Sequence, residues 1–241
     1  MKNSEDEGPF YVGYLPKAPP ALARFTRKTV VIAGVIAIGS ALGAAIGLPY
    51  FGAGRFEFGQ PREFAGTIRC EGAAPRLVAG DADYLLVGYG KHGVPLEICG
   101  TSGREVNARG TLIQRDGKSL IELAQLPEAR GPVSPAPPSV SLGRFTLRGE
   151  VVDAKCYFGV MNPAEGRTHR ACAELCLRGG VPAVLVARDR SGAVVHLLIA
   201  DAEGRSINEK LLRWVGEPVE LSGEVQRHGR WLVLRPELDV H

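Results

Sequence analysis

A stretch without a single charged residue runs from Thr29 to Gly54, close to the start of the 241-residue chain. About 20 consecutive apolar residues are enough to cross the ~30 Å hydrocarbon core of a bilayer. The stretch therefore predicts one transmembrane helix, which we place at residues 29–51. A cleaved signal peptide is the alternative, but its apolar core usually has only about 7–15 residues.

The distribution of cations predicts the orientation of this helix. Arg24, Arg27 and Lys28 stand directly before the apolar stretch, whereas the first cations after it are interleaved with glutamates. Basic residues favour the cytoplasmic side of a membrane segment. We therefore expect a bacterial inner-membrane protein with a cytoplasmic tail at residues 1–28 and a periplasmic C-terminal body.

Three glycines recur at every fourth position of the apolar stretch, namely Gly39, Gly43 and Gly47. This spacing places them on one face of a helix, where a second membrane helix can approach closely. The pattern predicts packing against another membrane subunit, although glycine is also common in membrane helices that have no partner.

The composition of the body narrows its partners and its chemistry. The net charge is only +3 and no Lys/Arg cluster is present, so nucleic acid is not an expected partner. All five cysteines follow the apolar stretch, and cysteines in an oxidising compartment are usually bridged, metal-bound or catalytic. We expect a disulfide between Cys70 and Cys99; two buried free thiols are the alternative.

A proline-rich segment at residues 127–142 divides the body into two parts, residues 56–126 and 143–241. Both parts end on a similar pair of strand-like runs, joined by Gln-Arg-x-Gly at Gln114 and again at Gln226. The Asp-Gly and His-Gly steps within these segments are typical of β-hairpin turns. The two parts of the body are therefore predicted to be structural repeats.

The repeated strand pattern predicts a mainly β fold. Each pair of runs contains an internal glycine, Gly110 or Gly223, which indicates a sharp bend or a bulge. Short strands, a bent strand and a closing hairpin resemble the OB-fold, a small five-stranded barrel. We predict two OB-like barrels in tandem, the second with helical stretches at residues 168–177 and 206–215; a two-sheet sandwich is the alternative.

One group of residues in the second barrel can carry chemistry: Cys156, His169, Cys172 and Cys176. The last three have the i, i+3, i+7 spacing of one helical face, so this helix should present all three side chains to the barrel. Asp153 lies close before Cys156 and either orients His169 or simply ends a strand. The first barrel has no comparable group.

This region resembles a family of small, largely uncharacterised exported bacterial proteins with the pattern G-x-V-V-D-x-x-C-Y, then H-x-x-C-A-x-x-C, then G-x-P. The resemblance covers about residues 145–236 and implies an exported OB-like domain, with no assigned activity to carry over. A single N-terminal anchor before an exported β domain is also similar to Rieske subunits in layout alone. The matching residues are Gly149, Val151, Val152, Asp153, Cys156, Tyr157, His169, Cys172, Ala173, Cys176, Gly180 and Pro182.

Three interpretations of the Cys/His group remain open. A Zn²⁺ ion accepts three cysteines and one histidine, but His169 and Cys176 would lie about 10 Å apart along a continuous helix, so the helix would have to begin after His169. A disulfide from Cys156 to a helical cysteine, with Cys176 favoured, suits an exported domain. A thiol redox pair or a haem-ligating site is the third, although neither CxxC nor CxxCH is present.

The sequence contains no Ser-His-Asp order, carboxylate pair or nucleotide-binding fingerprint, so catalysis is not expected. We expect an accessory subunit of a multi-subunit membrane complex, of the respiratory or electron-transfer kind, which contacts its partners through the transmembrane helix and the β domains. The alternative is a membrane-tethered metal- or thiol-redox protein that uses the Cys/His group.

Overall fold

The computed structural model describes residues 18–47 and 54–237, and the chain divides into two units, residues 1–51 and 52–241. We describe each unit by itself. Residues 1–17 of the predicted tail and residues 48–51 of the predicted transmembrane segment lie outside the described residues.

Among its described residues, 18–47, the first unit contains one helix, α1 (Pro20–Gly47), which begins nine residues before the predicted segment and includes its basic flank. Proline at the first helical position is favourable because its fixed φ suits a helix and its missing N–H is not needed there. The helix is long and apolar enough to cross a membrane. A membrane anchor and a signal sequence both have these properties. A Cβ atom added at Gly39, Gly43 or Gly47 would meet no atom within 4 Å.

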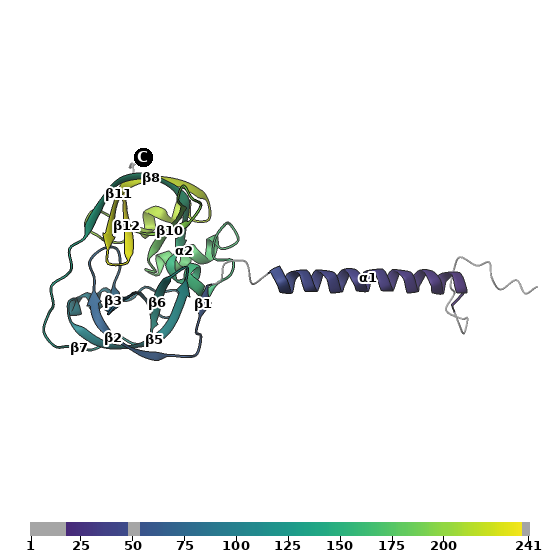
Figure 1. Ribbon diagram of the computed structural model, residues 1–241, viewed down its shortest axis with the longest axis horizontal. Helices are drawn as coiled ribbons and strands as arrows, with labels where there is room; N and C mark the ends of the chain where they lie inside the picture. Colours follow the sequence, from purple (N-terminus) through teal and green to yellow (C-terminus); the bar gives the residue numbers. More distant parts are fainter. Residues whose placement is uncertain (1–17, 48–53, 238–241) are drawn as a thin grey trace, which may run out of the picture. The chain divides into compact units, whose positions relative to one another are not determined.

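Two closed five-stranded β-barrels form the second unit (Figure 1). The strands of barrel 1 are β2 (Arg62–Arg69), β3 (Arg76–Ala79), β4 (Ala82–Val87), β5 (Glu105–Arg115) and β6 (Lys118–Leu123). Those of barrel 2 are β8 (Val140–Asp153), β9 (Ala183–Arg188), β10 (Val194–Ile199), β11 (Pro218–His228) and β12 (Trp231–Pro236). The predicted mainly β architecture is confirmed.

Both barrels have the same strand connectivity. In barrel 1, β2 pairs with β3 and β5, β4 pairs with β3 and in parallel with β6, and β6 closes the barrel on β5. In barrel 2 the strands β8 to β12 take the corresponding places, and β10 and β12 form the parallel pair. The short strands β1 (Arg55–Phe56) and β7 (Ala129–Arg130) extend barrel 1 along β5, so the proline-rich segment supplies one strand to its sheet.

The repeated Gln-Arg-x-Gly segments form the hairpins that close the barrels. Between β5 and β6, Asp116 and Gly117 both have positive φ, as a type I′ turn requires. Between β11 and β12 the two turn residues are Gly229 and Arg230, one position later than the His-Gly step predicts. Glycine at the first turn position is the preference of a type II′ turn.

The internal glycines of the repeats permit close backbone contact. A Cβ atom at Gly110 would lie 2.5 Å from the carbonyl oxygen of Glu122, and one at Gly223 would lie 2.2 Å from that of Arg235. The bulge predicted at Gly223 is not found there, because Gly223 pairs regularly with Phe145; the register between β11 and β8 shifts two residues later, between Val225 and Gln226. Glycine is needed at both positions because the facing strand passes directly over the Cα atom.

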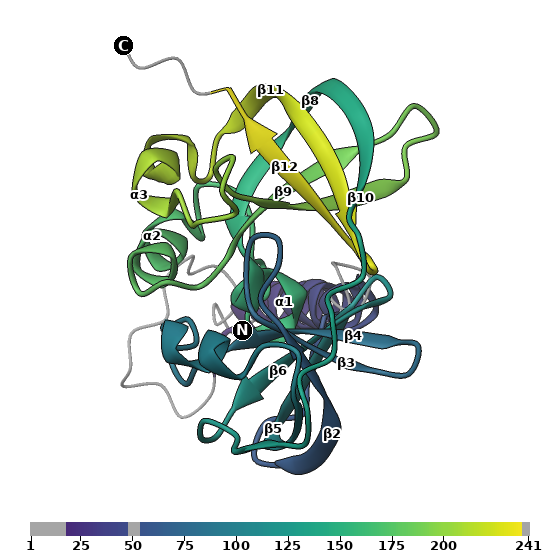
Figure 2. The same ribbon diagram turned by 90° about the vertical axis from the view of Figure 1, so that its left-hand side faces the viewer.

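The two barrels lie against each other (Figure 2). They share one hydrophobic core, and each barrel also has a core of its own. The shared core contains Leu85 and Ile113 of barrel 1, and Tyr157, Phe158 and Trp231 of barrel 2, all almost completely buried. Burial of large aromatic side chains between the barrels stabilises their association. The body therefore packs as one unit, although its sequence reads as two repeats.

A buried ion pair of barrel 1 also forms hydrogen bonds to barrel 2. Asp83 accepts hydrogen bonds from Nη1 of Arg76 at 2.6 Å and from the backbone N–H of Arg230 at 3.0 Å. The indole N–H of Trp231 donates to the backbone carbonyl of Asp83 at 3.1 Å, and Arg76 donates to the carbonyl of His228 at 3.1 Å. The turn between β11 and β12 is thus held on the β3–β4 hairpin.

The predicted disulfide between Cys70 and Cys99 is confirmed. It joins the end of β2 to the short helix η2 (Leu96–Thr101), across a sequence separation of 29 residues. Removing a disulfide of this kind typically costs about 2–4 kcal/mol, mainly because the unfolded chain gains freedom. We expect this loss in the free energy of unfolding of a Cys70→Ala/Cys99→Ala variant, measured by denaturant titration. Equal denaturation midpoints for the variant and the parent would contradict it.

Candidate metal and thiol site

The Cys/His group lies where β8 leads into helical segments next to barrel 1. After β8 ends at Asp153, the chain enters the short π-helical turn η3 (Cys156–Val160) and later the helix α2 (Arg170–Arg178). The α2 helix begins directly after His169, so His169 caps the helix and does not lie within it. Cys172 and Cys176 follow one turn apart on α2, where Cys176 is buried and Cys172 is half-buried.

The structure brings the candidate residues together as two overlapping groups. Cys156, Cys172 and Cys176 form one group, and Asp153, Cys156 and His169 form the other. Within each group the potential ligand atoms all lie within 4.8 Å of one another, so each group can hold a metal ion. Cys156 belongs to both groups and His169 lies in the second, which differs from the single Cys₃His set predicted above.

The predicted disulfide between Cys156 and Cys176 is not formed. Both residues are free cysteines, and their sulfur atoms lie 3.9 Å apart, in the geometry of a hydrogen bond between a thiol and a thiolate. The hydrogen bond to Cys176 and burial raise the pKa of the Cys156 thiol, whereas the hydrogen bond from Cys156 lowers the pKa of Cys176. Of the two thiols, Cys156 therefore holds its proton more tightly than Cys176.

His169 and Asp153 form a buried hydrogen-bonded pair. Nε2 of His169 lies 3.1 Å from Oδ2 of Asp153, and Oδ1 of Asp153 accepts a hydrogen bond from the backbone N–H of Cys156 at 2.8 Å. The carboxylate therefore orients the imidazole, which was one of the two roles considered for Asp153. A histidine whose ring nitrogen contacts a carboxylate is the usual arrangement beside a protein-bound metal.

Sequence reasoning missed the cation of this site, which comes from barrel 1. Lys91, in the loop after β4, places Nζ 2.7 Å from the sulfur of Cys172 and 3.9 Å from that of Cys176. The hydrogen bond to Cys172 raises the pKa of Lys91. In the sequence Lys91 lies between Gly90 and His92, where a solvated turn residue is expected.

A second lysine holds the Lys91 loop in place. Lys155 is almost fully buried, and its ammonium group donates to the carbonyls of Gly88 at 2.7 Å and Gly90 at 2.6 Å and forms an ion pair with Glu122. All three acceptors belong to barrel 1, whereas Lys155 directly precedes Cys156 in barrel 2. The loop that carries Lys91 is thus attached to the segment that carries the first cysteine.

A buried histidine near the site gives the fold a pH dependence. His196 packs against the rings of Tyr157 and Phe158, and burial lowers its pKa to about 4. The unfolded chain takes up this proton near pH 6.5. We therefore expect stability that is complete above that pH and falls progressively towards pH 4, because only the unfolded state binds the proton in between.

The denaturation midpoint at pH 7 and pH 5 measures this effect. A His196→Gln variant should show a smaller loss between the two values than the parent, since glutamine has no proton to gain. An equal loss in both proteins would exclude His196 as its source.

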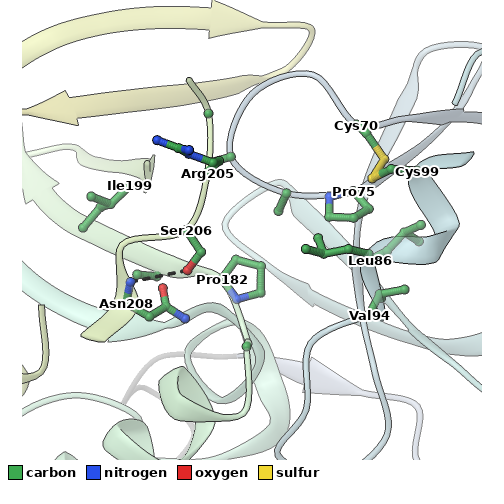
Figure 3. Close-up of a pocket in the computed structure, with 16 residues that line it drawn as sticks. Cys70, Pro75, Leu86, Val94, Cys99, Pro182, Ile199, Arg205, Ser206 and Asn208 are labelled. Atoms are coloured by element: carbon green, nitrogen blue, oxygen red, sulfur yellow. Dashed lines mark hydrogen bonds between the residues drawn. A yellow bond between two sulfur atoms is a disulfide. The ribbon is translucent and has the colours of Figure 1, made fainter. Parts of the chain in front are cut away.

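A cavity of about 190 Å³ lies between the barrels beside the disulfide (Figure 3). The amide nitrogen of Asn208 donates to the carbonyls of Leu177 at 2.7 Å and Val181 at 2.9 Å, which fixes the end of α2. Its amide oxygen is buried and has no hydrogen-bond partner among the described residues. Apolar walls with one free acceptor make this cavity a second candidate binding site. Its lining includes Cys70, Pro75, Leu86, Val94, Cys99, Pro182, Ile199, Arg205, Ser206 and Asn208.

No protein-family model, no curated protein and no solved structure matches the chain. The resemblance noted from the cysteine motif therefore stays a prediction. The functional assignment rests on the geometry of the site.

Proposed function

We propose that this protein is a membrane-anchored metal-binding protein whose ion is held by the sulfurs of Cys156, Cys172 and Cys176. The observation that carries the proposal is that three free cysteines lie together in one group. Cys172 and Cys176 lie on α2, and Cys156 and Cys176 are almost fully buried. Two sulfurs bound to the same Zn²⁺ would lie roughly 3.8 Å apart, given Zn–S bonds of about 2.3 Å in a tetrahedral site. The separation of 3.9 Å between Cys156 and Cys176 fits this requirement.

Zn²⁺ is the ion that the donor set fits. It accepts cysteine thiolates and histidine nitrogen. The site offers three sulfurs, and the hydrogen-bonded pair of His169 and Asp153 lies next to Cys156. Ion binding would remove the proton of Cys156, because the ligand must be a thiolate. A bound Zn²⁺ would connect the η3 segment to α2 and supply structural stability.

Zinc content of the purified protein tests this proposal. We expect full-length protein, purified in detergent under reducing conditions, to retain about one zinc per chain, and Cys156→Ser and Cys176→Ser variants to lose it. A His169→Ala variant should bind about 10–100-fold more weakly if the imidazole supports the ligands. The Cys70→Ala/Cys99→Ala variant is the matched control and should keep its zinc. A protein that retains no zinc, and whose thiols react equally fast with and without added zinc, would contradict the proposal.

The barrels themselves are OB-like in this proposal. The shared connectivity, with one parallel pair between the third and fifth strands and a helical segment before the last hairpin, supports that class. Such barrels commonly present a binding face. In the same proposal, α1 anchors the protein in a bacterial inner membrane. The N-terminal tail lies in the cytoplasm and the body lies in the periplasm. A C-terminal reporter that is active only in the cytosol would contradict this orientation.

A second candidate function is an accessory subunit of a larger membrane complex of the respiratory or electron-transfer kind. An exposed apolar groove on barrel 2 favours it: Leu142 and Phe145 of β8 are 43% and 45% exposed, beside Leu147 and Val195. The small-residue face of α1 adds a surface for a membrane helix. Purification through a C-terminal tag in mild detergent should recover a defined partner subunit, and Gly43→Leu and Phe145→Ser should each reduce its yield. Recovery of the chain alone would count against this function.

A further inference from the structure

The hydrogen bond from Lys91 to Cys172 is unusually short for a sulfur acceptor. N–H···O hydrogen bonds span about 2.7–3.2 Å, and sulfur is a larger atom than oxygen, so N–H···S contacts are longer. The Nζ–Sγ separation here is 2.7 Å. One oxygen atom bonded to both the nitrogen and the sulfur would hold them at about this separation.

The two atoms are held together by the backbone around them. The N–H of Gly93 donates to the carbonyl of Gly179 at 2.9 Å, immediately after α2. A Cβ atom at Gly179 would lie only 1.9 Å from the carbonyl oxygen of Lys91, so the two backbones are in direct contact. Lys155 also donates hydrogen bonds to the carbonyls of Gly88 and Gly90 in the same loop. The amine and the thiol are therefore held close together, and this proximity accelerates bond formation between them.

The geometry points to an oxidative crosslink in which Nζ of Lys91 and Sγ of Cys172 are joined through one oxygen atom. Lys91 is exposed and Cys172 is half-buried, so a small oxidant reaches both. The oxidant is a peroxide. One thiol, one amine and two molecules of hydrogen peroxide give the N–O–S link and three molecules of water. The thiol first forms a sulfenic acid and water. The ammonium group of Lys91 releases a proton to solvent, and a second peroxide oxidises the resulting amine to a hydroxylamine and water. The sulfenic acid and the hydroxylamine then condense to the N–O–S link with loss of the third water. Two equivalents of a dithiol reductant restore the thiol and the amine and release the oxygen as water.

The link would control the metal site, a consequence that rests on the proposed function. Cys172 cannot be a thiolate ligand while its sulfur is bonded to oxygen, so peroxide would lower zinc affinity and a dithiol would restore it. Formation of the link itself does not require a metal. Its detection and the zinc measurement can therefore fail independently.

Mass spectrometry of the full-length protein tests the crosslink. Trypsin should release Cys172 in the peptide 171–178, and Lys91 lies between the cleavage sites at Arg76 and Arg104. After peroxide treatment of metal-free protein in detergent, an unreduced digest should contain peptides 77–104 and 171–178 joined, with no cleavage after Lys91. Peptide 70–76 stays attached to 77–104 through the disulfide between Cys70 and Cys99. The mass of this species should equal the sum of the three peptides plus one oxygen atom, minus two hydrogens for the new link and two for the disulfide. Dithiothreitol should reverse it.

Two variants separate this link from other oxidation products. Lys91→Arg keeps the positive charge and should abolish the joined peptide, whereas Lys210→Arg, at an exposed lysine on α3 (Asn208–Leu211), should leave it unchanged. A Cys172–Cys176 disulfide, a joined mass without the extra oxygen, or sulfinic acid at Cys172 with normal cleavage after Lys91 would each overturn the proposal.

Discussion

Replacement of Asp83 by alanine is expected to lower the free energy of unfolding by about 3–5 kcal/mol, because it leaves a buried charge without its partner. The side chains of Arg76 and Asp83 are only 5% and 4% exposed. Without the carboxylate, the guanidinium of Arg76 would stay buried and the N–H of Arg230 would lose its acceptor. The turn between β11 and β12 should then loosen from barrel 1.

Trp231 reports on this loosening, because its indole N–H donates to the backbone carbonyl of Asp83. Denaturant unfolding of the full-length protein, followed by tryptophan fluorescence, should show a clearly lower midpoint for Asp83→Ala. Glu220→Ala is a matched control, since its partner Arg148 is largely exposed and such pairs contribute little. Equal midpoints for the two variants would show that the buried pair does not stabilise the junction.

Replacement of Lys155 by methionine should cost a similar amount, about 3–5 kcal/mol, because the Glu122 side chain, only 11% exposed, would remain without a cation. The carbonyls of Gly88 and Gly90 would lose their donor at the same time. This substitution has a second effect that Asp83→Ala lacks. It releases the loop of Lys91, so the ammonium group should leave Cys172.

A paired substitution distinguishes the ion pair from the packing. Adding Glu122→Leu to Lys155→Met removes both charges, so part of the lost stability should return, although the two carbonyls stay without a donor. The reaction rate of Cys172 with a thiol reagent measures the second effect and should change in both variants. An unchanged rate would mean that Lys155 does not position Lys91.

The sequence predicted those parts of the fold that depend on local pattern. The Gln-Arg-x-Gly segments and the internal glycines Gly110 and Gly223 indicated two repeated β units, since turn type and strand contact depend on residues close in the chain. Cys70 and Cys99 were correctly paired because each repeat was treated as a separate unit. The hairpin of barrel 2 differed by one residue, since Gly229 rather than His228 starts the turn.

Contacts between the repeats could not be predicted in this way. Lys91, Lys155 and Asp83 are polar residues near turns or strand ends, where solvent exposure is the default expectation. The packing of barrel 1 on barrel 2 brings Lys91 to Cys172, Lys155 to the carbonyls of Gly88 and Gly90, and the N–H of Arg230 to Asp83. The disulfide expected between Cys156 and Cys176 was wrong, since both cysteines are free and their sulfurs lie 3.9 Å apart. Lys91 of the other barrel lies beside these sulfurs, and no part of the local sequence indicates that contact.

The shared connectivity of the barrels has an evolutionary consequence. Duplication of one domain would produce two barrels of the same strand order in a single chain. Here one copy supplies the sulfurs and the other supplies the ammonium group beside them. Exchange of either barrel for another of the same strand order would keep every strand but separate Lys91 from Cys172. The two barrels must therefore be inherited together for this contact to persist.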